Sequence, residues 1–186
     1  MFGDLHIHMI LDGVYYRAAI DAQKEHPLDG LVRARLSDYQ ARGVCLLRDG
    51  GDAWGVSLRA RELAGEYGID YRSPAFPIYR RGHYGAFIGR GFDTEDEYRA
   101  LLDEAGEKRA DFIKLMISGL IDFDHFGVLT EPGPEPQDIR RMIELAHAAG
   151  FAVMAHANGD RAVMAALQAG VDSIEHGAYL SESALL

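Results

Sequence analysis

Four histidines and one lysine in this sequence have side chains that can take part in metal binding, and all five lie at or near the ends of predicted strands. His6 and His8 come first, two residues apart. In a strand, Asp4, His6 and His8 point to one face while Leu5 and Ile7 point to the other. Because the nitrogen of neutral histidine is a common metal ligand, this pair predicts part of a metal site.

Lys114 interrupts an otherwise apolar segment that runs from Phe112 to Ile117. A charged ammonium buried there would cost several kcal/mol, and burial lowers a lysine pKa, which leaves a free amine. A free amine can add carbon dioxide to form a carbamate, whose two oxygens could bridge two metal ions. The alternative is a lysine that extends to the strand end or pairs with a carboxylate such as Asp4.

His156 and His176 directly follow the strand-like segments Phe151–Ala155 and Val171–Glu175. Taken singly, each is well explained as a strand-end histidine that bonds to the backbone. The carboxyl ends of parallel strands meet at one side of a sheet or barrel, so we expect these side chains to converge. The sequence therefore predicts one metal site with the ligands His6, His8, Lys114, His156 and His176.

Strand-like and helical segments alternate along the whole chain, with six strands and five complete helices. Glycines end several of the predicted helices, and Thr94 to Glu97 forms a capping box at the start of another. Two segments, 76–91 and 118–134, are predicted as long loops. Strict alternation of this kind predicts an α/β fold with parallel strands and right-handed crossovers.

Two parallel architectures fit this pattern, an open doubly wound sheet and a (β/α)8 barrel of the TIM type. No glycine-rich phosphate loop follows the first strand, which disfavours the nucleotide-binding open sheet. Chemistry at several strand ends favours the barrel, which takes about 250 residues when complete. We therefore predict a single domain over 1–186 with about six of the eight βα units, ending before strands seven and eight. The open edges of strands one and six could then pair in a homo-oligomer.

The composition is that of an ordinary globular protein, with 48% hydrophobic and 26% charged residues among 186. Acidic residues outnumber basic ones by 29 to 19, which argues against nucleic acid or an anionic membrane as partner. We see no membrane-spanning apolar segment and no secretory signal. The single cysteine, Cys45, lies in an apolar segment, and we expect a packed core residue in a cytoplasmic protein.

Four motifs resemble the metal signatures of the amidohydrolase superfamily: His6-Ile7-His8, Phe112–Met116, Ala155–Gly159 and Asp172–Gly177. Their order and flanking residues are most similar to imidazolonepropionase-like enzymes and metal-dependent Xaa-Pro or Xaa-Arg dipeptidases. The resemblance covers nearly the whole chain.

The resemblance implies a binuclear metal centre, with His6 and His8 on the inner ion and His156 and His176 on the outer ion. A carboxylated Lys114 would bridge the two, and we assign catalytic roles to Lys114 and His176. We expect two divalent ions, zinc first, with manganese, iron or nickel as alternatives. Family members also carry a strand-eight aspartate that moves the proton of the attacking water. This sequence shows no counterpart, so the isolated chain is expected to bind metal but to lack part of the hydrolytic machinery.

The predicted function is hydrolysis of a C–N bond by metal-activated water, in EC class 3.5 or 3.4, on a cyclic amide, an amide or a dipeptide-like small molecule. Residues of the two long loops are candidates for substrate contacts: Arg80, Arg81, His83, Tyr84 and His125. Three alternatives stay open. A lactonase or phosphotriesterase could use the same metals, a His-rich phosphatase-type barrel would not need Lys114, and a metal-binding remnant would lack catalysis.

Overall fold

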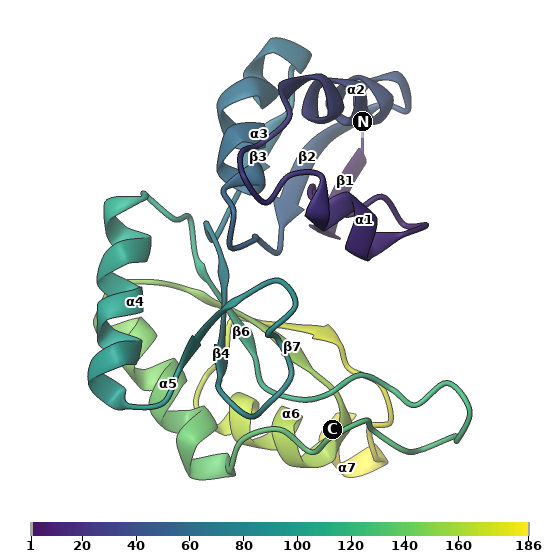
Figure 1. Cartoon of the computed structure of the whole chain (residues 1–186). Coiled ribbons are helices and arrows are strands. Elements are labelled where there is room, and N and C mark those ends of the chain that lie inside the picture. Colours follow the sequence, from purple (N-terminus) through teal and green to yellow (C-terminus); the bar gives the residue numbers. More distant parts are fainter. Residues whose placement is uncertain (1, 186) are drawn as a thin grey trace.

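The computed structural model describes residues 2–185, and its strands form two parallel β-sheets, each with helices packed against it (Figure 1). The first sheet has the order β1-β2-β3, with bounds Phe2–Ile7, Val44–Asp49 and Asp70–Arg72. The second has the order β5-β4-β6-β7-β8, with bounds Arg90–Phe92, Pro77–Arg80, Ile113–Met116, Val153–Ala157 and Ser173–His176. Every strand pair in both sheets is parallel, which confirms the predicted α/β class.

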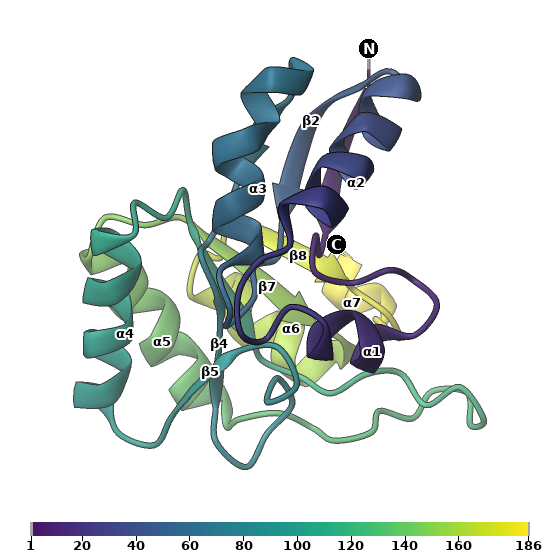
Figure 2. The same cartoon turned by 45° about the horizontal axis from the view of Figure 1, so that its top comes forward.

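The helices connect successive strands, as the sequence pattern predicts (Figure 2). Their bounds are Tyr16–Asp21 (α1), Asp29–Ala41 (α2), Val56–Ala64 (α3), Glu95–Glu107 (α4), Pro136–Ala148 (α5), Gly159–Gln168 (α6) and Glu182–Leu185 (α7). Thr94 caps α4, because its hydroxyl accepts a hydrogen bond from the Glu97 backbone N–H at 3.2 Å. The Glu97 carboxylate reaches back to the Asp93 backbone N–H, one residue earlier than an ideal capping box requires.

Each sheet has its own hydrophobic core. In the first, Ile7, Leu47 and Tyr71 pack against buried residues of α2 and α3, such as Leu36 and Ala60. The core of the second sheet is larger and holds apolar side chains of α4, α5 and α6. Burial of this apolar area is the main stabilising contribution to the fold.

The chain passes from the first sheet to the second between β3 and β4, where the sequence predicts one strand over 69–75 followed by a loop. The structure corrects this prediction. The strand stops at Arg72, and Ala75 adopts a positive φ of 65°. The Ser73 carbonyl accepts a backbone hydrogen bond from Asp111 at 2.8 Å, which ties this crossing to the start of β6. The segment predicted as a loop contains β4 and β5, whose three or four residues each are too few for a periodic pattern.

The apolar residues of strand β2 differ in burial. Leu47 is fully buried, but Val44, Cys45 and Leu46 are half-buried. The apolar run misleads here because the described helices α2 and α3 pack on only one face of this sheet. Cys45 is therefore not the packed core residue expected from the sequence, and its thiol lies 3.5 Å from the Phe2 carbonyl oxygen.

Among the described residues, four strands pair with a single neighbour and leave one edge without a strand partner: β1 and β3 in the first sheet, β5 and β8 in the second. In the same part of the chain, no helix is long and apolar enough to cross a membrane.

Asp49 is a fully buried carboxyl group at the end of β2. Its oxygens accept hydrogen bonds from the backbone N–H groups of Met9 (3.1 Å) and Gly51 (2.6 Å) and from the Tyr71 hydroxyl. Burial raises the pKa of Asp49 from 3.8 to about 6, while the Tyr71 hydrogen bond opposes that rise. Because the folded-state pKa lies above the ordinary value, Asp49 favours folding most below pH 4 and loses that contribution as the pH rises through about 6.

Replacing Tyr71 with Phe removes the hydroxyl that stabilises ionised Asp49. At pH 7 we expect the free energy of unfolding to fall by about 1–3 kcal/mol, since a buried charged acceptor loses a donor. At pH 4, where Asp49 is protonated, the loss should be smaller. Urea unfolding at both pH values measures this, with Tyr15→Phe as control because Tyr15 is 74% exposed. Equal stability of the two variants at pH 7 would contradict the role of this hydrogen bond.

Candidate functional site

The four predicted histidines and Lys114 meet in one cavity of about 160 Å³ at the carboxyl ends of strands from both sheets. The ring centroids of His6 and His8 are 5.5 Å apart, those of His6 and His176 4.9 Å, and those of His156 and His176 4.6 Å. The remaining lining residues are mainly apolar or aromatic: Leu11, Tyr84, Phe87, Met116 and Leu120. Residues far apart in the sequence thus form one compact group.

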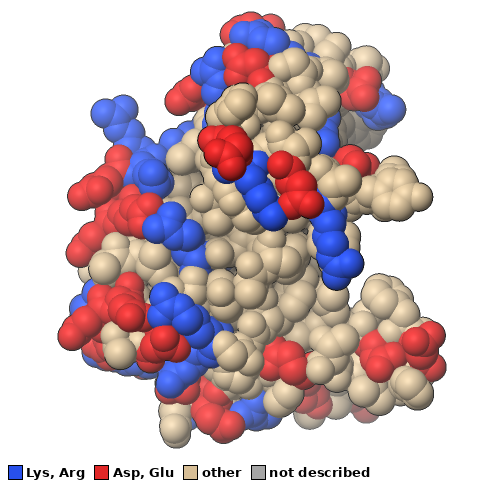
Figure 3. Space-filling model, in the orientation of Figure 1, with Lys and Arg blue, Asp and Glu red and all other residues tan. Residues whose placement is uncertain are grey.

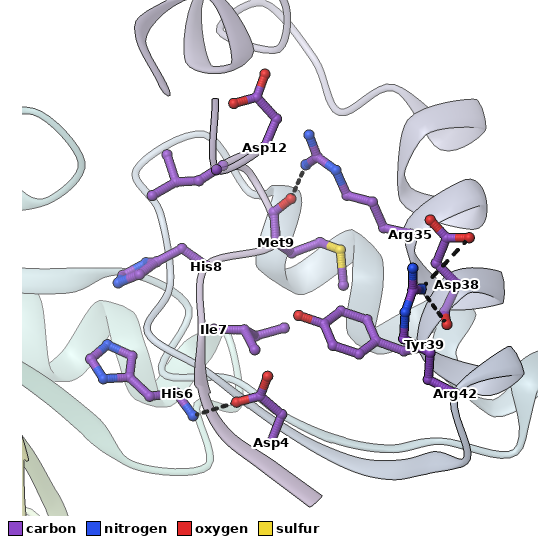
Figure 4. Close-up of a pocket in the computed structure, with 12 residues that line it drawn as sticks. Asp4, His6, Ile7, His8, Met9, Asp12, Arg35, Asp38, Tyr39 and Arg42 are labelled. Atoms are coloured by element: carbon purple, nitrogen blue, oxygen red, sulfur yellow. Dashed lines mark hydrogen bonds and ion pairs between the residues drawn. The ribbon is translucent and has the colours of Figure 1, made fainter. Parts of the chain in front are cut away.

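His6 and His8 lie on the same side of the chain at the end of β1, as predicted, but Asp4 does not join them. Figure 4 shows Asp4 on the side of Ile7, toward Tyr39 of α2, while both imidazoles point away. The register between β1 and β2 shifts between Asp4 and Ile7, which breaks the strict alternation of a strand. The cavity of about 630 Å³ drawn in Figure 4 therefore lies mostly on the Asp4 side of β1, between β1 and α2.

Lys114 is fully buried in the middle of β6, between Ile113 and Leu115. Its Nζ atom lies 3.4 Å from Nε2 of His6. Burial lowers the pKa of Lys114 from 10.5 to about 7, with an opposing contribution from the charge of Glu175. A substantial fraction of this side chain is therefore a neutral amine at neutral pH.

Three of the imidazoles are neutral at pH 7. Burial lowers the pKa of His8 and of His156 to about 3 and that of His176 to about 4. Positive charge on a neighbouring group lowers each pKa further. Lys114 acts on His8, His176 acts on His156, and His6 acts on His176. Neutral imidazole is the form that binds metal ions.

The imidazole nitrogens face partners within the protein. Nδ1 of His8 lies 3.0 Å from the Gly51 carbonyl oxygen, and Nε2 of His156 lies 3.2 Å from the Gly119 carbonyl oxygen. Across residues 2–185, no group of three or more His, Cys, Asp or Glu side chains has the arrangement of a formed metal site. Each of these two imidazoles keeps its second nitrogen for another ligand.

Glu175 connects the two sheets at this site, although it was not among the site residues predicted from the sequence. Its Oε2 atom lies 3.0 Å from Nδ1 of His6, and its Oε1 atom accepts a hydrogen bond from Arg48 at 2.6 Å. Arg48 also donates to the Leu5 carbonyl oxygen and to the Ser173 hydroxyl, so it joins β1, β2 and β8. Because ionised Glu175 can only accept, Nδ1 of His6 carries the proton and Nε2 is left as an acceptor or ligand.

The charge of Glu175 is maintained by its surroundings. Burial alone would raise the pKa of Glu175, but the hydrogen bond from His6 and the charges of Lys114 and Arg48 hold it at about 2. Consecutive residues of a strand normally point to opposite faces. Here His176 has a positive φ of 74°, which turns the strand end so that both Glu175 and His176 reach His6.

Two of the five predicted substrate contacts lie at the site. His83 and Tyr84 line a cavity next to the histidines, and the Tyr84 ring lies 5.0 Å from the His156 ring. Burial raises the pKa of Tyr84 to about 12, so its hydroxyl keeps its proton at neutral pH. Glu131 holds this segment in place, since its carboxylate accepts from the Tyr84 backbone N–H and lies 3.0 Å from Nδ1 of His83.

The other three predicted contacts lie outside the lining of the histidine cavity and of the cavity next to it. Arg80 pairs with Asp138 of α5, and Arg81 pairs with Asp93 and Glu97 near the start of α4. His125 is 72% exposed in the 118–134 loop and pairs with Asp122. Each of these side chains instead has a carboxylate partner on a neighbouring helix or loop.

Asn158 precedes α6 and Asp160 lies in its first turn, but neither side chain caps the helix. The Asn158 side chain donates to the Gly119 carbonyl oxygen at 3.1 Å and accepts from the Ala178 backbone N–H at 3.0 Å. Asp160 accepts from the Ser181 backbone N–H. Both side chains instead fix the loop segments around His156 and His176.

A model of the amidohydrolase family matches residues 56–185, which hold Lys114, His156 and His176. The chain belongs to the amidohydrolase family. Ochratoxinase of Aspergillus niger is 28% identical over 144 residues, which make up 75% of this chain and 28% of that enzyme.

Solved structures support the same family and its prolidase-like branch. A prolidase in complex with N-methylphosphonate-L-proline is 25% identical, with a TM-score of 0.72 over 98% of this chain and 49% of its own. A. niger ochratoxinase gives a TM-score of 0.73 at 20% identity, and a Xaa-Pro dipeptidase with bound methionine gives 0.71 at 20%. This chain spans 48% and 49% of the lengths of those two structures.

Replacing Glu175 with Gln should disturb the junction of the two sheets. A glutamine amide must direct its NH₂ group at a donor, either the Arg48 guanidinium or the protonated Nδ1 of His6. We expect the free energy of unfolding to fall by about 1–3 kcal/mol in urea at pH 7. The nitrogen NMR signals of His6 should also show mixed tautomers.

The control for this variant is Glu107→Gln, at the exposed end of α4. An unchanged His6 tautomer together with control-level stability in Glu175→Gln would contradict the bridging role of Glu175.

Proposed function

We propose that these residues form the metal-binding part of a hydrolase that cleaves the C–N bond of an amide or dipeptide-like small molecule. The observation that carries the proposal is the meeting of His6, His8, Lys114, His156 and His176 in one cavity at the strand ends. Active sites at the carboxyl ends of parallel strands are the rule in (β/α)8 enzymes. Family membership and the similarity to an ochratoxinase and to prolidases support an amide as the bond that is cleaved.

The chemistry of the donor set fits divalent metal ions. His6 and His8 would hold one ion and His156 and His176 a second, with carboxylated Lys114 bridging them. Zinc suits imidazole ligands, and manganese, iron or nickel would also accept this set. Such ions, when bound, lower the pKa of water to near neutrality and polarise a carbonyl oxygen.

Lys114 is suited to carboxylation because burial keeps much of it as a free amine. The Nζ lone pair would attack carbon dioxide, forming an N–C bond and releasing one proton, which leaves a carbamate with two oxygens. A carbamate would also add a second negative charge near Arg48, which pairs with Glu175 in the structure. Lys114 would thereby hold the site together, and His176 would be positioned beside it by the turn at the end of β8.

The remaining residues would bind and orient the substrate. The Tyr84 hydroxyl keeps its proton and can donate a hydrogen bond to a carbonyl oxygen, while Glu175 keeps the His6 ring in one tautomer. In the overall reaction the carbonyl carbon gains the OH of water and the amine nitrogen gains its H. The wider architecture is part of the proposal: strands seven and eight of a (β/α)8 barrel, or strands of a second copy, would pair with the open edges of β1 and β8.

The Lys114→Ala variant tests the bridging role. We expect the purified chain, stripped with a chelator and reloaded with zinc, to bind two ions per chain, and the variant to lose most of this metal. Mass spectrometry of the metal content measures both, with Lys24→Ala as control because its side chain is 50% exposed. A variant with the metal content of the control would contradict the proposal and favour a His-rich site that does not need this lysine.

Substrate assays complete the test. Xaa-Pro dipeptides and N-acyl amino acids are compared with a lactone and a phosphotriester on the zinc-loaded chain. Faster hydrolysis of the amides supports the proposal, whereas hydrolysis of only the lactone or the phosphotriester would overturn the choice of bond. Metal binding without any hydrolysis is expected both of a metal-binding remnant and of a chain that lacks the strand-eight aspartate, so it would leave the choice of bond to the metal-dependent binding of these compounds.

Gly50 offers a more local perturbation of the site. A Cβ atom at this position would lie 2.4 Å from Cε1 and 2.6 Å from Nε2 of His8, so the imidazole must move. We expect Gly50→Ala to lower the zinc affinity by about tenfold or more, the size of effect seen when the surroundings of a metal ligand are disturbed. Its thermal stability should stay close to that of the wild type. Calorimetric titration with zinc measures the affinity.

The matched control is Gly30→Ala in α2, where nothing lies within 4 Å of the added Cβ atom. Equal zinc affinities of Gly50→Ala and Gly30→Ala would argue against His8 as a ligand.

A further inference from the structure

A second cavity, of about 580 Å³, adjoins the histidine cavity. Four residues line both: Leu11, Tyr84, Phe87 and Leu120. The two cavities are therefore direct neighbours. A volume of this size is in the range that holds small organic ligands.

Aromatic rings lead from the second cavity to the histidines. The Tyr16 ring meets the Phe87 ring edge-on, with centroids 5.9 Å apart, and Phe87 is 5.4 Å from Tyr84. Tyr84 in turn lies 5.0 Å from His156. Aromatic rings at these spacings offer faces and edges on which an apolar or aromatic group can pack.

No Asp, Glu, Lys or Arg side chain belongs to the described lining of this second cavity, which consists of Leu11, Tyr16, His83, Tyr84, Gly85, Ala86, Phe87 and Leu120. Figure 3 shows mostly uncharged atoms in the region between α1 and the 118–134 loop. Arg17 is near, but its guanidinium lies 5.2 Å over the Tyr16 ring rather than in the lining. The cavity thus suits an apolar group better than a carboxylate or an ammonium.

The wall formed by 83–88 is anchored in the fold before any ligand arrives. Ile88 is fully buried, and its carbonyl oxygen accepts a hydrogen bond from the Ala53 backbone N–H at 2.9 Å. Gly85 has a φ of 133° and passes so close to Tyr79 that a Cβ atom would lie 2.6 Å from that side chain. A wall fixed in this way binds a ligand with little loss of conformational entropy.

We propose that this cavity is a specificity pocket for a bulky apolar group, aromatic by preference, that the amide substrate carries next to the bond placed at the histidines. The inference rests on the proposed function, because it assigns the substrate class of that same site. Tyr16, Phe87 and Leu120 are the residues that set the preference, and small or charged groups at this position are excluded.

Binding of uncleaved amides tests the pocket independently of hydrolysis. The probes are N-acetyl-L-phenylalaninamide, N-acetyl-L-alaninamide and N-acetyl-L-lysinamide, titrated calorimetrically into the full chain with and without zinc. We expect the phenylalanine probe to bind about tenfold or more tightly than the alanine probe, as hydrophobic pockets discriminate, and the lysine probe to bind weakest. Hydrolysis of Xaa-Pro dipeptides that differ in the same side chain is followed in parallel.

Two variants locate the preference. Leu120→Asp places a charge in the pocket at a side chain that is 38% exposed, and Phe87→Ala removes one ring. Both should abolish the tenfold preference. Tyr16→Ala, at a ring that lines the second cavity but not the histidine cavity, should do so while the zinc content stays unchanged. Leu167→Asp, at a 47% exposed leucine on α6 outside the pocket, is the matched control and should keep the preference.

The outcomes separate this inference from the proposed function. A phenylalanine preference that Leu120→Asp abolishes, without hydrolysis of any amide, supports the pocket and contradicts the hydrolase. Hydrolysis with equal binding of all three probes, or no binding of any probe, overturns the pocket. A phenylalanine preference that survives in both pocket variants also overturns the pocket. The pocket is likewise overturned if the variants change the self-association of the chain and not the binding of the probes, because the apolar surface would then be a contact between two copies.

Discussion

The two sheets of this protein depend on one buried carboxylate. Glu175 binds the protonated nitrogen of His6 and the guanidinium of Arg48, and Arg48 reaches β1, β2 and β8. In the part of the chain that the structure describes, no backbone ladder joins the two sheets. Their relative position is set by side-chain hydrogen bonds, by the crossing at 73–76, by the backbone bond from Ala53 to Ile88 and by the packing of Ile88 in the core of the first sheet. An unpaired charge on buried Glu175 would cost several kcal/mol, so its pairing with His6 and Arg48 favours this arrangement of the two sheets.

The same interaction prepares the site for its chemistry. Fixing the His6 tautomer through Nδ1 leaves Nε2 toward Lys114, 3.4 Å away. Burial lowers the pKa of the lysine and of the three neighbouring imidazoles, because surroundings of low polarity disfavour their charged forms. Neutral amine and neutral imidazole are the forms that the proposed metal site requires. The cost of removing these groups from water is thus the source of their reactivity.

Hydrogen bonds hold the loops around the site in place, and aromatic side chains line the site. Glu131 joins the segment at 83–84 to the 118–134 loop, while Asn158 and Asp160 fix the turns beside His156 and His176. The rings of Tyr16, Phe87 and Tyr84 then line a route to His156. Polar contacts set the positions of the walls, and apolar side chains form the surface that a substrate would touch. This is the usual composition of a small-molecule site.

The sequence by itself determined the α/β class, the helices with clear periodicity or caps, and the five residues that gather at the strand ends. These follow from local patterns, in which apolar spacing and glycine or threonine at helix ends act within a few residues. The family, too, was recognisable from those motifs, whereas closure into a barrel stays a prediction.

Only the tertiary structure decided that Asp4 turns away from His6, that Cys45 is half-buried, and that Arg80, Arg81 and His125 bind carboxylates elsewhere. It also brought Glu175 and Arg48 together across 127 positions of sequence. Such pairings depend on charge and distance in three dimensions, and no spacing along the chain encodes them.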